Sequence, residues 1–120
     1  MSEPVVVMSS VVLNVRDLER AKAFWTEVLG VGVNHEVEPF FAWLAPQEGS
    51  KVNVALQVVA DEKVGRNRVH IDSFVPELDA AQRRIEELGG THVEDHEIAG
   101  FRWRIMADPD GNEFCIAAEG

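Results

Sequence analysis

Two polar residues at alternate positions, near the middle of the chain, could do chemistry. His70 and Asp72 form an H-x-D pair, and in an extended segment their side chains share one face, about 7 Å apart. A carboxylate beside an imidazole can orient it as a general base or support it as a metal ligand. We therefore take both as candidate catalytic residues. The alternative is a polar pair that lines a hydrated cleft without chemistry.

The single cysteine, Cys115, is the next residue with reactive potential. One cysteine excludes an internal disulfide and cannot alone make a thiolate zinc site. It would act as a nucleophile only with a lowered pKa and a base such as His70 nearby. The alternative is a small buried apolar group.

Other charged residues are interpreted as solvated. His92, Glu94 and His96 alternate and should share one strand face in an acidic region, for which no further metal ligand can be named. The loop before His70 carries the basic and amide residues Lys63, Arg66, Asn67 and Arg68. Basic residues in a surface loop are usually just hydrated, although Arg68 would suit a carboxylate.

A duplicated pattern positions these residues. Residues 11–30 and 71–90 align with five identities at an offset of 60, half the chain. Each copy predicts a strand of alternating apolar residues and then an amphipathic helix closed by glycine. Asp17 is expected to cap the first helix, and Pro76 to lie in the first turn of the second.

Short strand-like runs follow each helix, at about 31–37, 40–45 and 51–59 and then at about 91–95, 101–106 and 113–117. The expected fold class is α+β: two βαβββ modules in tandem whose sheets pair to form a curved, cleft-bearing, barrel-like surface. We expect one domain over residues 1–120, with module one at about 8–60 and module two at about 67–118.

Strand parity sorts the side chains between a helix-covered face and the cleft. The polar residues expected in the cleft are Ser10, Asn14, Gln57, His70, Asp72 and Cys115. Trp43 and Trp103 would wall it and stack on a planar ligand, the alternative being ordinary packing between sheets. All eight are candidate site residues.

Charge and composition exclude several function classes. Eleven basic residues stand against 21 acidic ones, giving a net charge of −10. Nucleic-acid binding and an anionic membrane surface both require a positive face, so neither is expected. No apolar run approaches the roughly 20 residues of a membrane helix. Glu3 stands where a signal peptide would be basic, so we expect a cytoplasmic protein.

The chain resembles the vicinal oxygen chelate superfamily of glyoxalases, bleomycin-resistance proteins and extradiol dioxygenases. The resemblance rests on the helix sequence VRDLERAKAFWTEVLG and on the stretch from HIDSFVPELDAAQRRIEELGG to DPDGNEFCI. The NRVHID pattern, a tryptophan five residues before the DPDG turn and the GNEFC ending are similar to small bacterial glyoxalase-like domain proteins. Small members of the superfamily usually pair, so the resemblance implies a homodimer.

The resemblance also implies four metal-ligand points, which fall on Ser10, Gln57, His70 and Cys115. Because serine is a poor ligand, no metal is expected; a weak divalent metal would use His70, Gln57 and Cys115. The expected function is small-molecule binding, with a metal-independent lyase or isomerase activity through His70 and Asp72. The alternative is a non-catalytic resistance protein that sequesters a drug or toxin.

Overall fold

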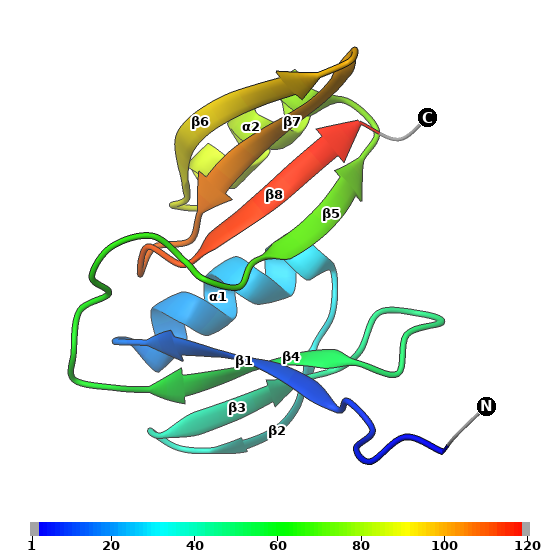
Figure 1. Cartoon of the computed structure of the whole chain (residues 1–120). Coiled ribbons are helices and arrows are strands. Elements are labelled where there is room, and N and C mark those ends of the chain that lie inside the picture. Colours follow the sequence, from blue (N-terminus) through cyan, green and yellow to red (C-terminus); the bar gives the residue numbers. More distant parts are fainter. Residues whose placement is uncertain (1–2, 119–120) are drawn as a thin grey trace. The chain divides into compact units, whose positions relative to one another are not determined.

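A computed structural model describes residues 3–118 and divides the chain into two compact units, one ending at Val59 and the next beginning at Ala60 (Figure 1). Module one contains β1 (Ser10–Val15), α1 (Leu18–Leu29), β2 (Val33–Val37), β3 (Phe41–Leu44) and β4 (Asn53–Val58). Module two contains β5 (Ile71–Val75), α2 (Leu78–Glu87), β6 (Thr91–Ile98), β7 (Phe101–Ala107) and β8 (Glu113–Ala118).

The two modules have the same topology, which confirms the predicted α+β class and the tandem βαβββ repeat. The sheet orders are β1-β4-β3-β2 and β5-β8-β7-β6. In each sheet the first and last strands of the module pair in parallel, whereas the other neighbours pair antiparallel. Each sheet is open, with two edge strands, so neither is closed into a barrel.

Helix α1 begins and ends where the sequence predicts. The Asp17 side chain accepts a hydrogen bond from the backbone N–H of Arg20 at 3.0 Å, and Gly30 ends the helix in the left-handed region at a φ of 67°. Phe24 and Trp25 are almost fully buried on the face that packs against β3 and β4. The helix therefore covers one face of its sheet.

Helix α2 differs from its prediction at the first turn. Its cap is Glu77, whose carboxylate accepts from the backbone N–H groups of Asp79 and Ala80, and Pro76 precedes the cap. The expected first-turn position of Pro76 is therefore wrong. The carboxylate of the longer glutamate side chain still reaches the free N–H groups of the first helical turn, as the side chain of a shorter capping residue does. Helix α2 then packs on β6, β7 and β8.

A β-bulge changes the parity of β6. The register with β7 shifts between His92 and Glu94, which adds Val93 to one strand only. His92 consequently faces α2, with its Nε2 2.8 Å from the Asp95 carboxylate, whereas Glu94 and His96 face away from the helix. The expectation that His92, Glu94 and His96 share a face is therefore wrong.

Within residues 3–118, neither helix has the length and apolar character needed to cross a membrane.

Candidate active site

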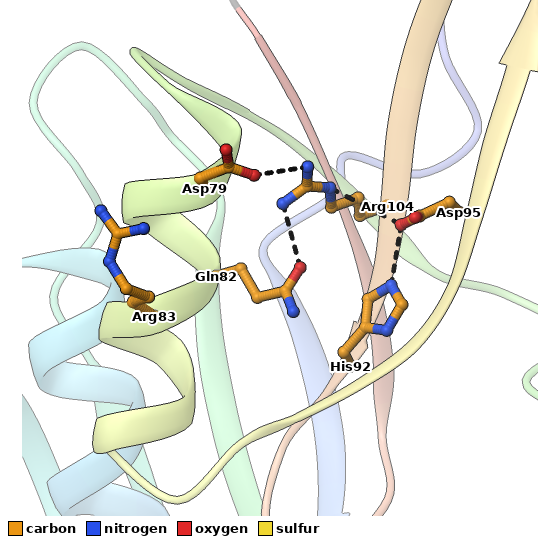
Figure 2. A pocket seen from close by; sticks show the side chains of 6 residues that line it. All are labelled: Asp79, Gln82, Arg83, His92, Asp95 and Arg104. Atoms are coloured by element: carbon orange, nitrogen blue, oxygen red, sulfur yellow. Dashed lines mark hydrogen bonds and ion pairs between the residues drawn. The ribbon is translucent and has the colours of Figure 1, made fainter.

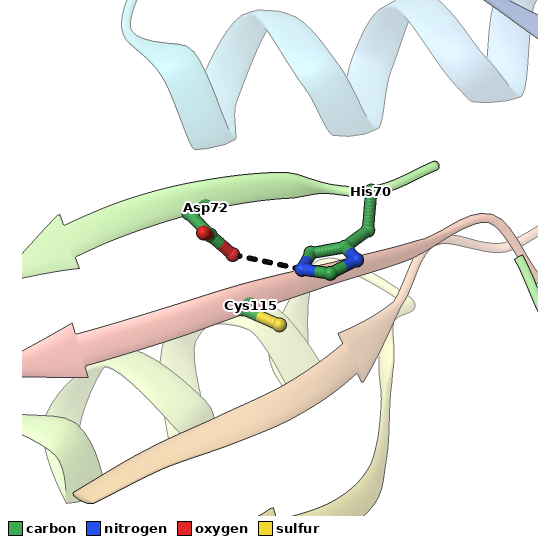
Figure 3. Close-up of side chains that lie close together, drawn as sticks. All are labelled: His70, Asp72 and Cys115. Carbon is green, nitrogen blue, oxygen red and sulfur yellow. Dashed lines mark ion pairs between the residues drawn. The ribbon is translucent and has the colours of Figure 1, made fainter. Parts of the chain in front are cut away.

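The candidate site lies on the helix-free face of module two. His70 comes one residue before β5, and Asp72 lies within β5 directly opposite Cys115 of β8. The imidazole Nε2 is 3.0 Å from a carboxylate oxygen of Asp72 (Figure 3). Both side chains are exposed, at 50% for His70 and 79% for Asp72. The pair is therefore open to a ligand from solvent.

The Asp72 carboxylate also lies beside Cys115. The thiol is buried, and its sulfur lies within 4.8 Å of a carboxylate oxygen of Asp72. Burial, reinforced by the negative charge of Asp72, raises the pKa of the Cys115 thiol to about 11. A thiol that stays protonated at neutral pH is a poor nucleophile. Cys115 therefore remains a neutral thiol beside the Asp72 carboxylate, which pairs with the imidazole of His70.

A cavity of about 640 Å³ opens beside this pair. Its polar lining residues are His70, Asp72 and Ser73, and its apolar wall is formed by Phe74, Ile98, Phe101, Trp103 and Ala117. All of these residues belong to module two. A few polar groups at one end of a largely apolar wall are the usual composition of a small-molecule site.

Trp103, in the aromatic part of the apolar wall (the aromatic wall), contacts two neighbouring rings. The ring of Trp103 stacks on His96, with centroids 5.1 Å apart and planes at 12°, and Phe101 lies 5.6 Å from the indole. His96 is in turn 3.2 Å from Glu94. We did not predict the contact between His96 and Trp103. It follows from their pairing across the β6–β7 ladder, which the bulge sets.

Four predicted site residues lie on the corresponding face of module one. Ser10 donates to the side chain of Asn53 at 2.5 Å, and Asn14 lies opposite Gln57 in the β1–β4 ladder. Trp43 lies across from Ala55, and its ring contacts Phe41 at 4.0 Å. The offset of 60 makes Ala55, and not Gln57, the repeat counterpart of Cys115.

Among residues 3–118, which the structure describes, the side chains of His70, Asp72 and Cys115 form a set whose ligand types suit a divalent metal. The donor atoms of His70, Asp72 and Cys115 all lie within 4.8 Å of one another. Nitrogen, oxygen and sulfur are all ligands that zinc takes, and three protein ligands with one open position are typical of a catalytic zinc site. The residues therefore fit a metal. Binding would require the Cys115 thiol to lose its proton, which is unfavourable at neutral pH because the pKa of the thiol is raised to about 11.

A second acidic set has another explanation. Glu19, Glu36 and Glu38 also place carboxylate oxygens within 4.8 Å of one another. The Lys22 ammonium lies 2.8 Å from both Glu19 and Glu36, and these hydrogen bonds raise the Lys22 pKa. A lysine thus neutralises much of this cluster, which ties α1 to β2.

A second cavity, of about 350 Å³, lies on the helix-covered side of module two (Figure 2). Arg104 donates there to Gln82 at 3.0 Å and to Asp79 at 2.7 Å, while His92 pairs with Asp95 at 2.8 Å. The Arg104 hydrogen bond holds the pKa of Asp79 below its usual value. Because these charged groups satisfy one another, they join α2 to the sheet rather than present a reactive group.

The duplicated βαβββ fold and the family match over residues 10–117 place the chain in the vicinal oxygen chelate superfamily, which includes glyoxalases, bleomycin-resistance proteins and dioxygenases. Within it, residues 10–117 match the family described as glyoxalase-like domain, and the chain belongs to that family.

Similar proteins include enzymes and a resistance protein. Glyoxalase 1 of Caenorhabditis briggsae is 30% identical over 118 residues, which are 89% of this chain and 41% of the relative. The chain thus spans less than half the length of that curated relative. The structure of a lactoylglutathione lyase from Agrobacterium tumefaciens matches at a TM-score of 0.69 and 20% identity, covering 98% of this chain and 96% of that one.

The fosfomycin resistance protein FosX of Listeria monocytogenes also has this fold, with a TM-score of 0.78 and 17% identity. The match covers 98% of this chain and 93% of FosX. That structure is a complex with Mn(II) and 1S,2S-dihydroxypropylphosphonic acid. Superfamily neighbours therefore include a protein that binds a divalent metal and a small molecule.

Proposed function

We propose that the chain binds a small molecule in the cavity of module two, and that His70, oriented by Asp72, serves as the general base of a lyase or isomerase. The observation that carries this proposal is the 3.0 Å contact between His70 and Asp72 at the polar end of a largely apolar cavity. A candidate base must lie within reach of the substrate before its pKa matters.

The contact determines which nitrogen accepts a proton. In the neutral imidazole, Nε2–H donates to the Asp72 carboxylate, so that Nδ1 carries the lone pair. Nδ1 would take a proton from the bound molecule, and the resulting imidazolium would be stabilised by Asp72. The neutral thiol of Cys115 lies beside the same carboxylate.

The aromatic wall would hold the remainder of the molecule. Trp103 is backed by His96 and flanked by Phe101, so its ring is a supported surface for a planar or apolar group. Gln57 of module one remains our prediction for a further contact to the same ligand.

A divalent metal, when bound, would be held by His70, Asp72 and Cys115 and would polarise a substrate oxygen as a Lewis acid. Its binding must displace the thiol proton of Cys115, whose pKa is about 11. We therefore propose weak binding at neutral pH and no tightly held resident metal. The test is the metal content of protein purified without chelator. One equivalent of metal in the wild type that is lost in His70→Ala would overturn this proposal.

Sequestration of a cationic aromatic compound is the second candidate function. The exposed Asp72 carboxylate stands beside an aromatic wall, in a chain of net charge −10. Such a site attracts a positive group through both the carboxylate and the faces of the rings. Binding without turnover would favour this function over the enzyme.

The module provides a matched control for the test. His92 and Asp95 form a second histidine–aspartate pair, at 2.8 Å, outside the proposed cavity. Turnover of S-lactoylglutathione, and binding of that thioester and of 1S,2S-dihydroxypropylphosphonic acid, are measured for the wild type, His70→Asn and His92→Asn. Each is measured with EDTA and with added Zn²⁺ or Mn²⁺.

We expect His70→Asn to weaken binding by about 1 kcal/mol or more, roughly fivefold, as for a lost hydrogen bond. His92→Asn should change it little. Equal effects of the two substitutions would contradict the proposed site.

We also propose a cytoplasmic homodimer. The edge strands β2 and β6 expose large apolar side chains, among them Val33, Val37 and Ile98. A two-fold contact is the commonest way to cover such edges. Light scattering at micromolar concentration should give twice the 13.3 kDa chain mass. A mass of one chain would reject the dimer.

A further inference from the structure

The segment that carries His70 needs an anchor of its own. The ladder between β5 and β8 begins at the pair Ile71 and Phe114, so His70 lies one residue outside it. The side chain of His70 must nevertheless keep its orientation toward Asp72. Contacts made by the preceding loop therefore decide where the imidazole lies.

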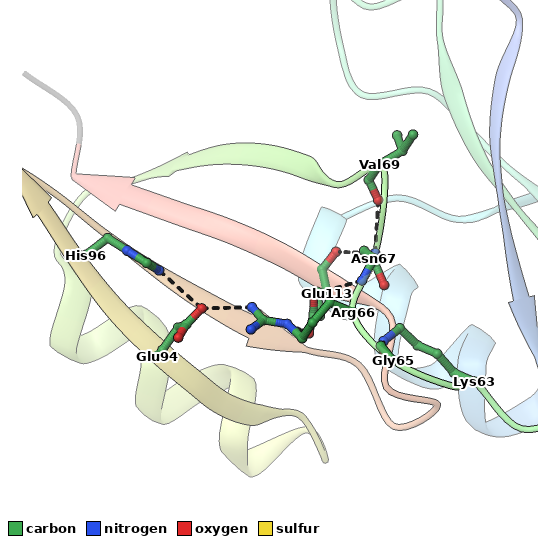
Figure 4. Close-up of polar contacts among 8 residues, drawn as sticks. All are labelled: Lys63, Gly65, Arg66, Asn67, Val69, Glu94, His96 and Glu113. Carbon is green, nitrogen blue, oxygen red and sulfur yellow. Dashed lines mark hydrogen bonds and ion pairs between the residues drawn. The ribbon is translucent and has the colours of Figure 1, made fainter.

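Glu113, the first residue of β8, provides this anchor (Figure 4). Its carboxylate accepts from Arg66 Nε at 2.6 Å and from the backbone N–H of Asn67 at 3.2 Å, and only 10% of its side chain is exposed. Its backbone carbonyl accepts from Asn67 Nδ2 at 3.1 Å. The side chain and the backbone of one residue thus hold two successive loop residues.

Asn67 transmits this restraint to the residue next to His70. The same Nδ2 group donates to the carbonyl of Val69 at 3.0 Å. The amide therefore joins β8 to the peptide unit that enters His70. Loss of the Asn67 side chain would release that unit without removing any cavity residue.

Arg66 extends the anchor to the aromatic wall. One guanidinium nitrogen, Nη2, donates to Glu94 at 2.8 Å while Nε binds Glu113. Hydrogen bonds from Arg66 and from His96 hold the Glu94 pKa below its usual value, and His96 stacks on Trp103. Arg66, a residue of the loop, thus links β6 and β8. A lysine could not replace it, because its single ammonium group lacks the rigid pair of nitrogen donors that binds both carboxylates at once.

We propose that Glu113, Arg66 and Asn67 are positioning residues that set the orientation of His70 toward Asp72 and, through Glu94 and His96, that of the Trp103 wall. The proposal rests on the proposed function for its significance, because it concerns the same cavity. It assigns a role to residues that line none of that cavity.

The test observes the histidine rings directly and needs no ligand. The chain has four histidines, His35, His70, His92 and His96. Ring signals of protein labelled with ¹³C and ¹⁵N at histidine are recorded by NMR for the wild type, Glu113→Gln and Asn67→Ala, with His70→Asn to assign its signal. The control is Glu97→Gln, which makes the same charge change at an exposed residue of β6.

We expect the His70 signal to move and broaden in Glu113→Gln and Asn67→Ala, and the His96 signal to move in Glu113→Gln. Signals of His35, in module one, should stay in place, and Glu97→Gln should leave His70 unchanged. An unmoved His70 signal in both folded variants would overturn the proposal. Where Glu113→Gln does not fold, Arg66→Lys replaces it, with the same expected shifts and the same overturning result.

The two proposals fail separately. If the wild type neither binds nor turns over the probe compounds but the His70 signal responds to Asn67→Ala, the positioning stands and the proposed function falls. If His70→Asn weakens binding as expected but the anchor variants leave both the His70 signal and the affinity unchanged, the positioning falls alone.

Discussion

The two modules place different chemistry at matching points of one scaffold. In module one, Ser10 is paired with Asn53 inside the β1–β4 ladder, and its hydroxyl donates to that amide. At the matching points, 60 residues later, stand His70 and Glu113, and here the histidine lies just outside the ladder. Glu113, which matches Asn53, binds Arg66 and Asn67 of the preceding loop and not the side chain of His70.

This difference distinguishes a strand end whose polar side chains bind each other from one that carries a histidine paired with an aspartate. The candidate groups of module one, on Ser10, Asn14 and Gln57, are neutral and do not ionise near neutral pH. Module two instead combines an imidazole, a carboxylate and a thiol whose ligand atoms lie within 4.8 Å. Duplication therefore supplied the frame twice, whereas the side chains suited to acid–base chemistry gather in the second copy.

The largest expected effect concerns two glycines at matching positions of the repeat, Gly30, which ends α1, and Gly90, which lies just after the end of α2. A Cβ at Gly90 would lie 2.6 Å from Ile85 Cγ2 and 2.9 Å from the carbonyl oxygen of Ala107, whereas Gly30 has open space and a φ of 67°. Gly90→Ala should reduce the free energy of unfolding by about 3 kcal/mol through overpacking, and Gly30→Ala by about 1 kcal/mol through backbone strain. Urea unfolding measures both. The reverse order would contradict the packing argument.

The ion pairs that tie each helix to its sheet should respond to pH in opposite ranges. Arg104 lowers the Asp79 pKa, so this pair stabilises module two above about pH 3.8, and the contribution is lost as the pH falls through the lower folded value. Glu19 and Glu36 raise the Lys22 pKa, so that pair contributes fully below pH 10.5 and is lost only as the pH rises through the higher folded value.

Urea midpoints measured at pH 3, 7 and 10 test this contrast. The destabilisation caused by Arg104→Met should shrink between pH 7 and pH 3. The destabilisation caused by Lys22→Met should stay the same between pH 7 and pH 10. A Lys22→Met effect that vanished by pH 10 would show that the lysine gains nothing from its two glutamates.

The smallest expected effect on ligand affinity is that of replacing the cysteine, because its thiol is neutral. With a pKa of about 11, Cys115 should react with iodoacetamide about 100-fold more slowly at pH 7 than an unperturbed thiol, and tenfold faster with each added pH unit. Cys115→Ser should change affinity for the probe compounds by less than about threefold, because serine keeps a neutral side chain of similar size beside Asp72. Rapid labelling at pH 7 would restore the nucleophile interpretation.

Much of the scaffold was predictable because its signals are local. Asp17 and Gly30 bound α1 through capping rules that need only neighbouring residues, and the offset of 60 identifies the second copy. The Glu77 cap was missed because shorter side chains usually fill that position. The β6 bulge was missed because an extra residue in one strand alters pairing without changing the composition.

The site was predictable only as far as strand parity reaches. Parity places Asp72 and Cys115 on one face, and they pair across β5 and β8. Arg66 was interpreted as a hydrated loop residue. Its salt bridges were missed because its partners, Glu94 and Glu113, are far away in the sequence. Tertiary contacts of that kind have no signature in the spacing of residues.

The most direct test of the account is an NMR screen of a small-compound library, including aromatic amines and aromatic acids, against the isotope-labelled wild type. The account predicts that bound compounds shift the ring signal of His70 and the indole N–H of Trp103, and leave the indole of the buried Trp25 in place. Shifts confined to the pocket of Asp79, His92 and Arg104, or to module one, would contradict the claim that the chemistry lies in the cavity of module two.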